Sequence, residues 1–461
     1  MIRAGRVAAV LEDAADAPAR AARVDLPPDA CVVPGFTDSH VHLLSWAAAR
    51  RELQLEGAAS EAEVLARVAG ACAGHGGRAL VGAGWLATGW TPTRQALDAV
   101  SGDVPVALLA HDRHSLWLNS AALALARGDL ELPGGVVERD ADGEPTGVLR
   151  EEAAWAFRDR HLRPSEAELR EALREALPAA AARGVVAVHD MDGHLGCVEV
   201  VRALRARDRL PLRVWHSQPA AWLDRLDPDT RYVKAYLDGA LGSGTARMLG
   251  GGGVEVTSRA AFEGIVRRAA ARRLPVAVHA IGDRAVRDAL DAFAATAGAW
   301  RGLRQRIEHA QCVHPDDLPR FAVLGVTASI QPSMAVTDEP LARARWADRL
   351  DRAYPYRALH DAGARLAGGS DAPIEPLDPV AGMRAAVLDG WQPPLDAATA
   401  LHAYTTVPAW LEGAARGRLA PGLPADLVVL DRDPLEDLAR VQPLATMLDG
   451  EWTHGGDTVD A

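Results

Sequence analysis

From about residue 184 onward, short apolar segments alternate with helical stretches that are rich in alanine and arginine. This alternation is typical of a parallel α/β fold, because parallel strands need helical crossovers between them. An eighth candidate strand lies far upstream, within Cys31 to His40, so the chain has enough strands to close a (β/α)8 TIM barrel. The other seven expected strands are Val185 to Asp190, Leu212 to Ser217, Tyr232 to Leu237, Pro275 to His279, Arg306 to His309, Val326 to Gln331 and Ala364 to Gly368.

The long interval between the first two barrel strands predicts a large insertion, and the two chain ends predict a third part. The insertion holds two helical segments, 61–73 and 93–99, a strand at 104–110 and a hairpin around 140–144. We expect it to cover the barrel end where the strands finish. Apolar strands at 2–11, 425–431 and 446–452 predict a small β-sandwich. The expected boundaries are 1–33 and 400–461 for the sandwich, 34–45 and 181–399 for the α/β barrel, and 46–180 for the insertion.

Composition excludes several classes of protein. Hydrophobic residues make up 49% and charged residues 24% of the chain, and no apolar run approaches the roughly 20 residues that span a bilayer. The first residues lack the features of a secretory signal, so we expect a cytoplasmic protein. A formal net charge of -12 argues against nucleic acid or an anionic membrane as partner, and a homo-oligomer stays open. The four cysteines form no Cys-x-x-Cys pair, which argues against a thiolate zinc cluster.

Lys234 is the only lysine, so the Lys+Arg total of 50 contains 49 arginines. Arginine replaces lysine on most surfaces, but its guanidinium stays protonated and is not a nucleophile. Lys234 lies near the end of an expected strand that runs into Asp238-Gly239. Compositional drift would also leave a single lysine in an arginine-rich chain. The strand context favours the alternative that position 234 requires an amine.

Histidines and a carboxylate recur where expected barrel strands end. His40 and His42 are two positions apart, so their side chains point the same way along a strand. Taken alone, the pair is more typical of two polar loop histidines than of a metal site. In a (β/α)8 barrel, however, all strand ends meet at one face. Imidazole and carboxylate suit zinc and related divalent cations, whereas a free ammonium does not bind them. The set expected at this face is His40, His42, Lys234, His279, His309 and Asp371.

These motifs resemble those of the amidohydrolase superfamily, in particular the metal-dependent branch that contains N-substituted formamide deformylases. The resemblance spans nearly the whole chain. The matching stretches are Pro34 to His42, Val233-Lys234 with Asp238 to Ser243, Val278 to Ala285, Arg306 to Gln311, Gly369 to Pro373 and Gly422 to Leu430.

The resemblance implies that CO2 converts Lys234 to a carbamate that bridges two divalent cations, expected to be Zn²⁺. Such a pair lowers the pKa of a shared water and polarises the scissile carbonyl. Asp371 would take the proton of that water and pass it to the departing amine. The implied reaction is hydrolysis of a non-peptide C–N bond in a small molecule, such as an N-acyl or N-formyl amide, a cyclic amide or a carbamate. His40 and His42 with Lys234 and Asp371 would hold the more buried ion, and His279 and His309 with the carbamate would hold the second.

Three further residues are candidates for contact with the substrate. The resemblance points to His114, with a surface imidazole as the alternative. Trp85 could wall a pocket or be a buried structural aromatic residue. His189 ends the second expected strand, where it could line the site or orient a ligand. Gly244 and Met334 stand where relatives often carry arginine and histidine, so the resemblance predicts no particular substrate.

Two other functions compete with hydrolysis. A lysine on a barrel strand can form an imine with a carbonyl substrate, which would make the protein a Schiff-base lyase. That reaction gives no role to four converging histidines. A catalytically silent relative that binds a ligand is the second alternative, since fold does not determine function. Loss of a metal ligand is the usual sign of such a relative, and every expected ligand is present here.

Overall fold

The structure is a computed structural model that describes residues 1–13, 16–18, 20–76, 78–126 and 130–459. The chain forms two compact units. The first comprises Met1–Ala47, Arg170–Leu237 and Thr257–Ala461, and the second comprises Ala48–Leu169 and Asp238–Val256. The second unit therefore combines the insertion after the first barrel strand with the segment that follows the strand of Lys234.

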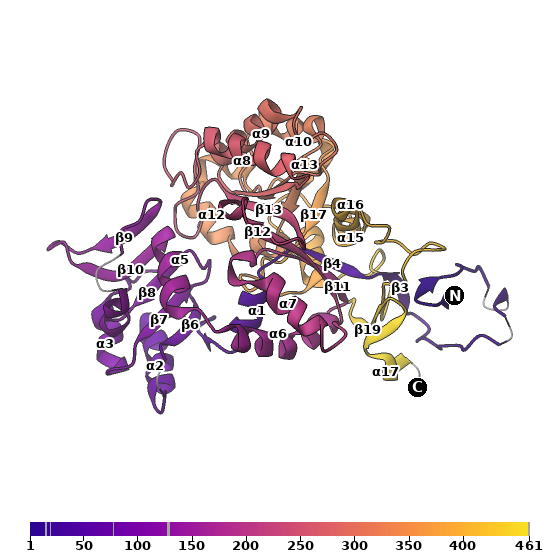
Figure 1. The fold of residues 1–461 in the computed structure, drawn as a ribbon, viewed down its shortest axis with the longest axis horizontal. Coiled ribbons are helices and arrows are strands. Elements are labelled where there is room, and N and C mark those ends of the chain that lie inside the picture. Colours follow the sequence, from indigo (N-terminus) through magenta and orange to yellow (C-terminus); the bar gives the residue numbers. More distant parts are fainter. Residues whose placement is uncertain (14–15, 19, 77, 127–129, 460–461) are drawn as a thin grey trace. The chain divides into compact units, whose positions relative to one another are not determined.

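A parallel sheet dominates the first unit (Figure 1). Its first and last strands approach each other, because His42 N donates to Ala372 O at 2.9 Å and Asp371 N donates to His40 O at 2.7 Å. The sheet thus nearly closes into the predicted (β/α)8 barrel. The eight strands found in the described residues are β4 (Phe36–Val41), β11 (Val185–Asp190), β12 (Arg213–Pro219), β13 (Thr230–Tyr236), β14 (Val276–Ala280), β15 (Arg306–His309), β16 (Thr327–Ile330) and β17 (Leu366–Gly368).

Helices connect these strands and bury one apolar face each. In α9 (Asp283–Thr296), Val286, Leu290 and Phe293 recur at helical spacing and are buried. Ser258 caps α8 (Arg259–Ala271) by accepting the Ala261 N–H. The other helices around the barrel are α1 (Leu43–Ala49), α6 (Glu166–Ala181), α7 (Cys197–Arg205), α10 (Leu318–Leu324), α11 (Pro332–Thr337), α12 (Glu339–Arg345), α13 (Tyr356–Asp361), α14 (Pro379–Arg384), α15 (Ala397–Ala403) and α16 (Thr406–Glu412).

The first expected strand is in fact two strands that belong to different sheets. The extended segment is interrupted at Gly35, so that β3 (Cys31–Pro34) ends before it and β4 begins after it. Gly35 N donates to Asp426 O at 3.0 Å, and a Cβ at Gly35 would lie 2.5 Å from a methyl carbon of Val186. Close approach of the backbone therefore requires glycine at the change of sheet.

The chain ends form separate antiparallel sheets. β3 pairs with β18 (Leu427–Leu430), which pairs with β19 (Pro443–Leu448) and, through it, with β20 (Glu451–His454). The single strand expected at 446–452 is thus a hairpin, because Asp449 and Gly450 both take positive φ. The hairpin of β1 (Ile2–Arg3) and β2 (Arg6–Val7) bonds to the chain before β18, with Val7 N donating to Leu423 O at 2.9 Å. A short helix, α17 (Gly456–Val459), follows β20.

The second unit has its own sheet of mixed direction, with hydrophobic clusters packed against it. The two expected helices, the strand and the hairpin are all present. In the described residues its strand order is β5 (Leu53–Gln54), β6 (Leu80–Trp85), β7 (Val106–Ala110), β8 (Ser115–Leu118), β10 (Pro145–Glu151) and β9 (Gly135–Arg139), and its helices are α2 (Glu61–Cys72), α3 (Arg94–Ser101), α4 (Ser120–Leu123) and α5 (Glu152–Phe157).

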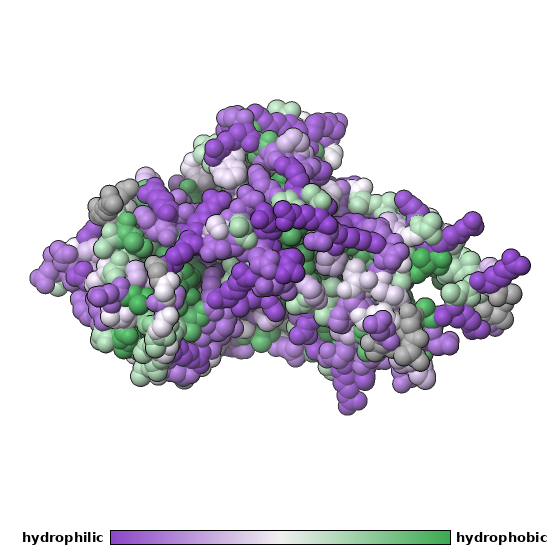
Figure 2. Space-filling model, turned by 60° about the horizontal axis from the view of Figure 1, so that its bottom comes forward, coloured by the Kyte–Doolittle hydropathy of each residue, from purple (hydrophilic) through white to green (hydrophobic). Residues whose placement is uncertain are grey.

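The face of the molecule drawn in Figure 2 carries mainly hydrophilic side chains. Figure 2 shows one face, on which hydrophobic groups lie scattered among hydrophilic ones. Among the described residues, the helices are all too short or too polar to cross a membrane.

Candidate metal centre

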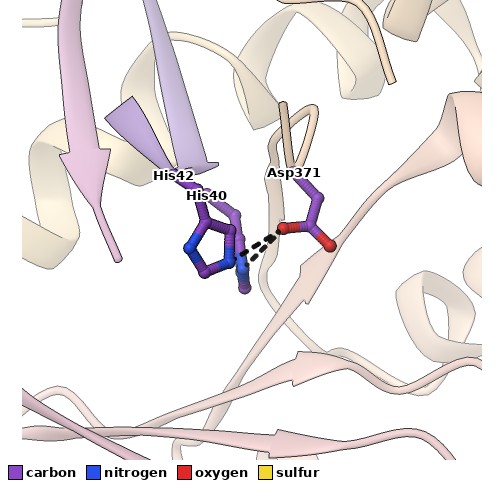
Figure 3. A group of neighbouring side chains, drawn as sticks. All are labelled: His40, His42 and Asp371. Atoms are coloured by element: carbon purple, nitrogen blue, oxygen red, sulfur yellow. Dashed lines mark ion pairs between the residues drawn. The ribbon is translucent and has the colours of Figure 1, made fainter. Parts of the chain in front are cut away.

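Three expected ligands meet at the seam where the barrel closes. His40 and His42 project from the end of β4, and Asp371 follows β17. The Nε2 atoms of His40 and His42 lie 3.2 Å and 3.4 Å from the same atom, Oδ1 of Asp371 (Figure 3). Three potential metal-binding atoms therefore lie close together, although the histidines and the aspartate are more than 300 positions apart in the sequence.

The other two histidines adjoin this group. His309, at the end of β15, places Nδ1 3.9 Å from Oδ2 of Asp371. Its ring centroid lies 4.9 Å from that of His40 and 4.5 Å from that of His279, which belongs to β14. The four imidazoles thus form one continuous group at the carboxyl ends of the strands, as the barrel topology requires.

Lys234 lies on β13 and is only 4% exposed. Burial lowers the pKa of its amine to about 8, because a charged ammonium loses hydration; Glu308 and Asp371 oppose this shift. The nearby guanidinium of Arg306 lowers the pKa further. The amine is therefore directed into the charged barrel interior and is easier to deprotonate than a solvent-exposed lysine.

Two carboxylates orient the histidines of β4 from behind. His40 Nδ1 lies 2.6 Å from Oε2 of Glu308, and His42 Nδ1 lies 2.9 Å from Oδ1 of Asp192. These contacts leave each Nε2 facing Asp371, the arrangement by which outer carboxylates orient metal-binding histidines. Neither Glu308 nor Asp192 is among the site residues predicted from the sequence. Their position beside strand ends that carry histidines was the available signal.

Arg306 holds the buried Glu308 in its charged form. Arg306 Nε lies 2.7 Å from Oε1 of Glu308. Burial alone would raise the pKa of Glu308, but the guanidinium of Arg306 and the imidazole of His40 outweigh burial and hold it well below its usual range. Burial likewise opposes ionisation of Asp371, whose pKa is nevertheless lowered, mainly by His40 and also by His42 and Lys234. Both residues are carboxylates at neutral pH.

The donor atoms fit a divalent cation. Within the described part of the chain, His40 Nε2 and Asp371 Oδ1 are buried without a well-directed hydrogen bond. Donor atoms of His40, His42 and Asp371 lie within 4.8 Å of one another. Buried polar atoms rarely stay unsatisfied, and two imidazole nitrogens with a carboxylate oxygen are donors that zinc accepts.

His189 belongs to the same network of hydrogen bonds and ion pairs. It is 2% exposed, and its Nδ1 accepts a hydrogen bond of 2.8 Å from Arg306. Its Nε2 lies 2.9 Å from Oε1 of Glu412 and therefore donates. Burial lowers the pKa of His189 to about 4, so the ring is neutral at physiological pH. Its contacts connect it through Arg306 to Glu308, behind His40.

The remaining candidates belong to the second unit. His114 Nδ1 lies 2.7 Å from Oε2 of the fully buried Glu151, which orients the ring. Trp85 is 5% exposed, its indole N–H donates to Leu108 O at 2.9 Å, and its ring packs on Trp117. This is the environment of a structural aromatic residue.

Known proteins share this architecture. Residues 29–454 match the amidohydrolase family. The chain is 31% identical to YtcJ of Bacillus subtilis, which is named as an amidohydrolase, over 88% of this chain and 84% of that protein. It is 27% identical to the N-substituted formamide deformylase of Arthrobacter pascens, over 91% of this chain and 87% of the relative. A metal-dependent hydrolase from Pyrococcus horikoshii superposes with a TM-score of 0.71 at 28% identity, covering 88% of this chain and 86% of its own.

The barrel and the residues at its strand ends thus place the protein in the class of metal-dependent hydrolases. Within this class, the chain belongs to the amidohydrolase family.

Proposed function

We propose that this protein hydrolyses a non-peptide C–N bond in a small molecule, such as an N-acyl or N-formyl amide, a cyclic amide or a carbamate. The observation that carries the proposal is the convergence of His40 and His42 on one oxygen of Asp371, beside a buried Lys234. The similarity to a formamide deformylase supports the choice of bond.

The proposed site contains two divalent cations, and the nitrogen and oxygen donor atoms present suit zinc. Bound cations would act as Lewis acids toward the attacking water and the scissile carbonyl. His40 and His42, kept in place by Glu308 and Asp192, would hold one ion with Asp371. His279 and His309 would hold the other, with the carbamate of Lys234 between the two.

Lys234 has the chemistry that carbamate formation needs. Its neutral nitrogen attacks CO2, an N–C bond forms and one proton leaves. With a pKa of about 8, roughly one tenth of the amine is neutral at pH 7, far more than for an ordinary lysine. Arginine at this position would stay protonated and unreactive.

Asp371 is the proposed general base and acid. Its low pKa keeps it ionised at neutral pH, ready to accept the proton of the attacking water. It would then deliver this proton to the departing amine nitrogen as the C–N bond breaks. His114, oriented by Glu151, is the proposed substrate contact. Trp85 and His189 were also predicted to contact substrate, and we propose structural and positioning roles for them instead, from their contacts.

Metal removal and substrate hydrolysis together test this function. The purified protein is treated with dipicolinate, then assayed with and without added Zn²⁺ on a panel of N-formyl, N-acyl, cyclic amide and carbamate substrates. We expect turnover that disappears with the metal and returns with Zn²⁺. Turnover that survives complete metal removal, together with borohydride trapping of substrate on Lys234, would support the Schiff-base lyase. Metal-loaded protein that hydrolyses no member of the panel would favour a ligand-binding relative.

A further inference from the structure

A second cluster of metal-ligating side chains lies in the barrel unit, outside the proposed catalytic set. Asp190 ends β11, Cys197 begins α7 and His216 lies on β12. One ligand atom from each lies within 4.8 Å of the others. Asp190 and Cys197 are 0% exposed and His216 is 3% exposed, so all three face the protein interior.

Two atoms of this cluster are unsatisfied. Within the described residues, Asp190 Oδ2 and His216 Nδ1 are buried and have no hydrogen-bond partner. They lie 4.0 Å apart, which is too far for a hydrogen bond. Zinc binds nitrogen and oxygen at about 2.0 to 2.2 Å, so two ligands of one ion can lie up to roughly twice that distance apart. Two such ligands at a tetrahedral angle lie about 3.4 Å apart, so the two atoms would move about half an ångström closer together to share one ion.

We propose that Asp190, Cys197 and His216 bind one further divalent cation of the zinc type. Carboxylate oxygen, thiolate sulfur and imidazole nitrogen are the three donors that zinc uses in proteins, and a small fourth ligand would complete a tetrahedron. When the cation binds, the S–H bond of Cys197 breaks, its proton goes to solvent and a sulfur–metal bond forms.

The surroundings of Cys197 are those of a thiol that loses its proton only when a cation binds. Burial and then the carboxylates of Asp190 and Asp192 raise the pKa of the thiol, so it stays protonated until a positive charge enters. Of the four cysteines, Cys197 and Cys312 are buried, and Cys197 belongs to the group of clustered ligand atoms.

The site is connected to the backbone that orients His42. Asp190 Oδ1 accepts the N–H groups of Leu43 at 3.3 Å and Asp192 at 3.0 Å. Asp192 in turn bonds to His42 Nδ1. A cation on Asp190 would therefore stabilise the segment that holds one of the catalytic histidines, which makes its role structural.

Cobalt absorption tests the proposal directly, because the six residues of the proposed catalytic centre include no thiol. Metal-free full-length protein is titrated with Co²⁺, and the near-ultraviolet thiolate-to-cobalt band is recorded. We expect a band that saturates at one thiolate-bound Co²⁺ per chain. The band should disappear in Cys197→Ala and persist in Cys312→Ala, which is the matched control for a buried cysteine outside the cluster. Cys31→Ala and Cys72→Ala should also retain it.

Metal counting gives the second readout. After Zn²⁺ loading and removal of free metal, Cys197→Ala should hold one equivalent fewer than wild type, and His216→Gln should match it. Absence of the band in wild-type protein, or its persistence in Cys197→Ala, would overturn the proposal. The wild-type titration decides even if a variant fails to fold. The band is independent of turnover, so failure of the proposed hydrolysis would leave this result unchanged. Likewise, absence of the band would leave the test of hydrolysis unchanged.

Discussion

His40 Nδ1 lies 2.6 Å from Oε2 of Glu308, a contact between two fully buried residues at the ends of different barrel strands. Arg306 neutralises the other oxygen of this carboxylate at 2.7 Å. The contact determines which nitrogen of His40 faces Asp371. The ion chain from Arg306 through Glu308 to His40 therefore organises the proposed metal site, although none of its outer members is a proposed ligand.

Glu308→Gln should weaken metal binding. The amide retains a hydrogen-bonding group but loses the charge that makes His40 a better ligand, and loss of such an outer partner typically lowers metal affinity 10- to 100-fold. Competition against a fluorescent chelator measures the change. Asp316→Asn, which alters an exposed carboxylate, serves as control. Equal metal affinity in Glu308→Gln and wild type would contradict an orienting role.

Asp371→Asn should separate metal binding from proton transfer. Four histidines and Lys234 remain to hold the metal, so metal content should stay near that of wild type. Turnover should fall by about 10² to 10⁴, the usual contribution of a general acid–base group. Steady-state kinetics on the best substrate and metal analysis of the same sample check this prediction. Undiminished kcat would rule out proton transfer by Asp371.

Lys234→Arg should lose nearly all activity, because a guanidinium cannot form a carbamate. With ¹³C-labelled bicarbonate, wild-type protein should show a carbamate carbon resonance that both Lys234→Arg and Lys234→Ala lack. Short carboxylic acids should partly restore activity to Lys234→Ala by replacing the missing bridge. A wild-type spectrum without the carbamate signal, recorded on fully metal-loaded protein, would be the contrary result.

Stability should decline in mild acid because of His189. Its pKa of about 4 in the folded protein lies below the ordinary value near 6.5, so between these values the unfolded chain binds a proton that the folded chain does not. The free energy of unfolding should therefore fall as pH falls through this window, by at most about 1.4 kcal/mol per pH unit from this group. Below about pH 4 its contribution stops changing.

Thermal unfolding midpoints of metal-free protein, recorded from pH 7 to pH 4.5, measure this effect. His189→Gln should show a shallower dependence on pH than wild type, whereas His360→Gln, a substitution of an exposed histidine, should not. Parallel curves for wild type and His189→Gln would show that His189 does not titrate in this window.

Local patterns in the sequence predicted the barrel strands well. The mainly apolar segment 185–190 matches β11 residue for residue, because strands buried on both faces read as apolar runs bounded by turns. The segment 306–309 also matches β15, although Ile307 is its one apolar residue. The change of sheet at Gly35 was missed. β3 and β4 are both extended and adjoin each other in the sequence, and only the packing of Val186 and the bond to Asp426 require a break there.

The sequence alone determined the repeating α/β pattern and which residue types end the strands, since both depend on neighbours along the chain. Tertiary structure decided the rest. Glu308 reaches His40, and Arg306 reaches His189, only because parallel strands bring residues more than 100 positions apart within bonding distance. Such pairings depend on barrel closure and side-chain direction, and neither is encoded in local periodicity.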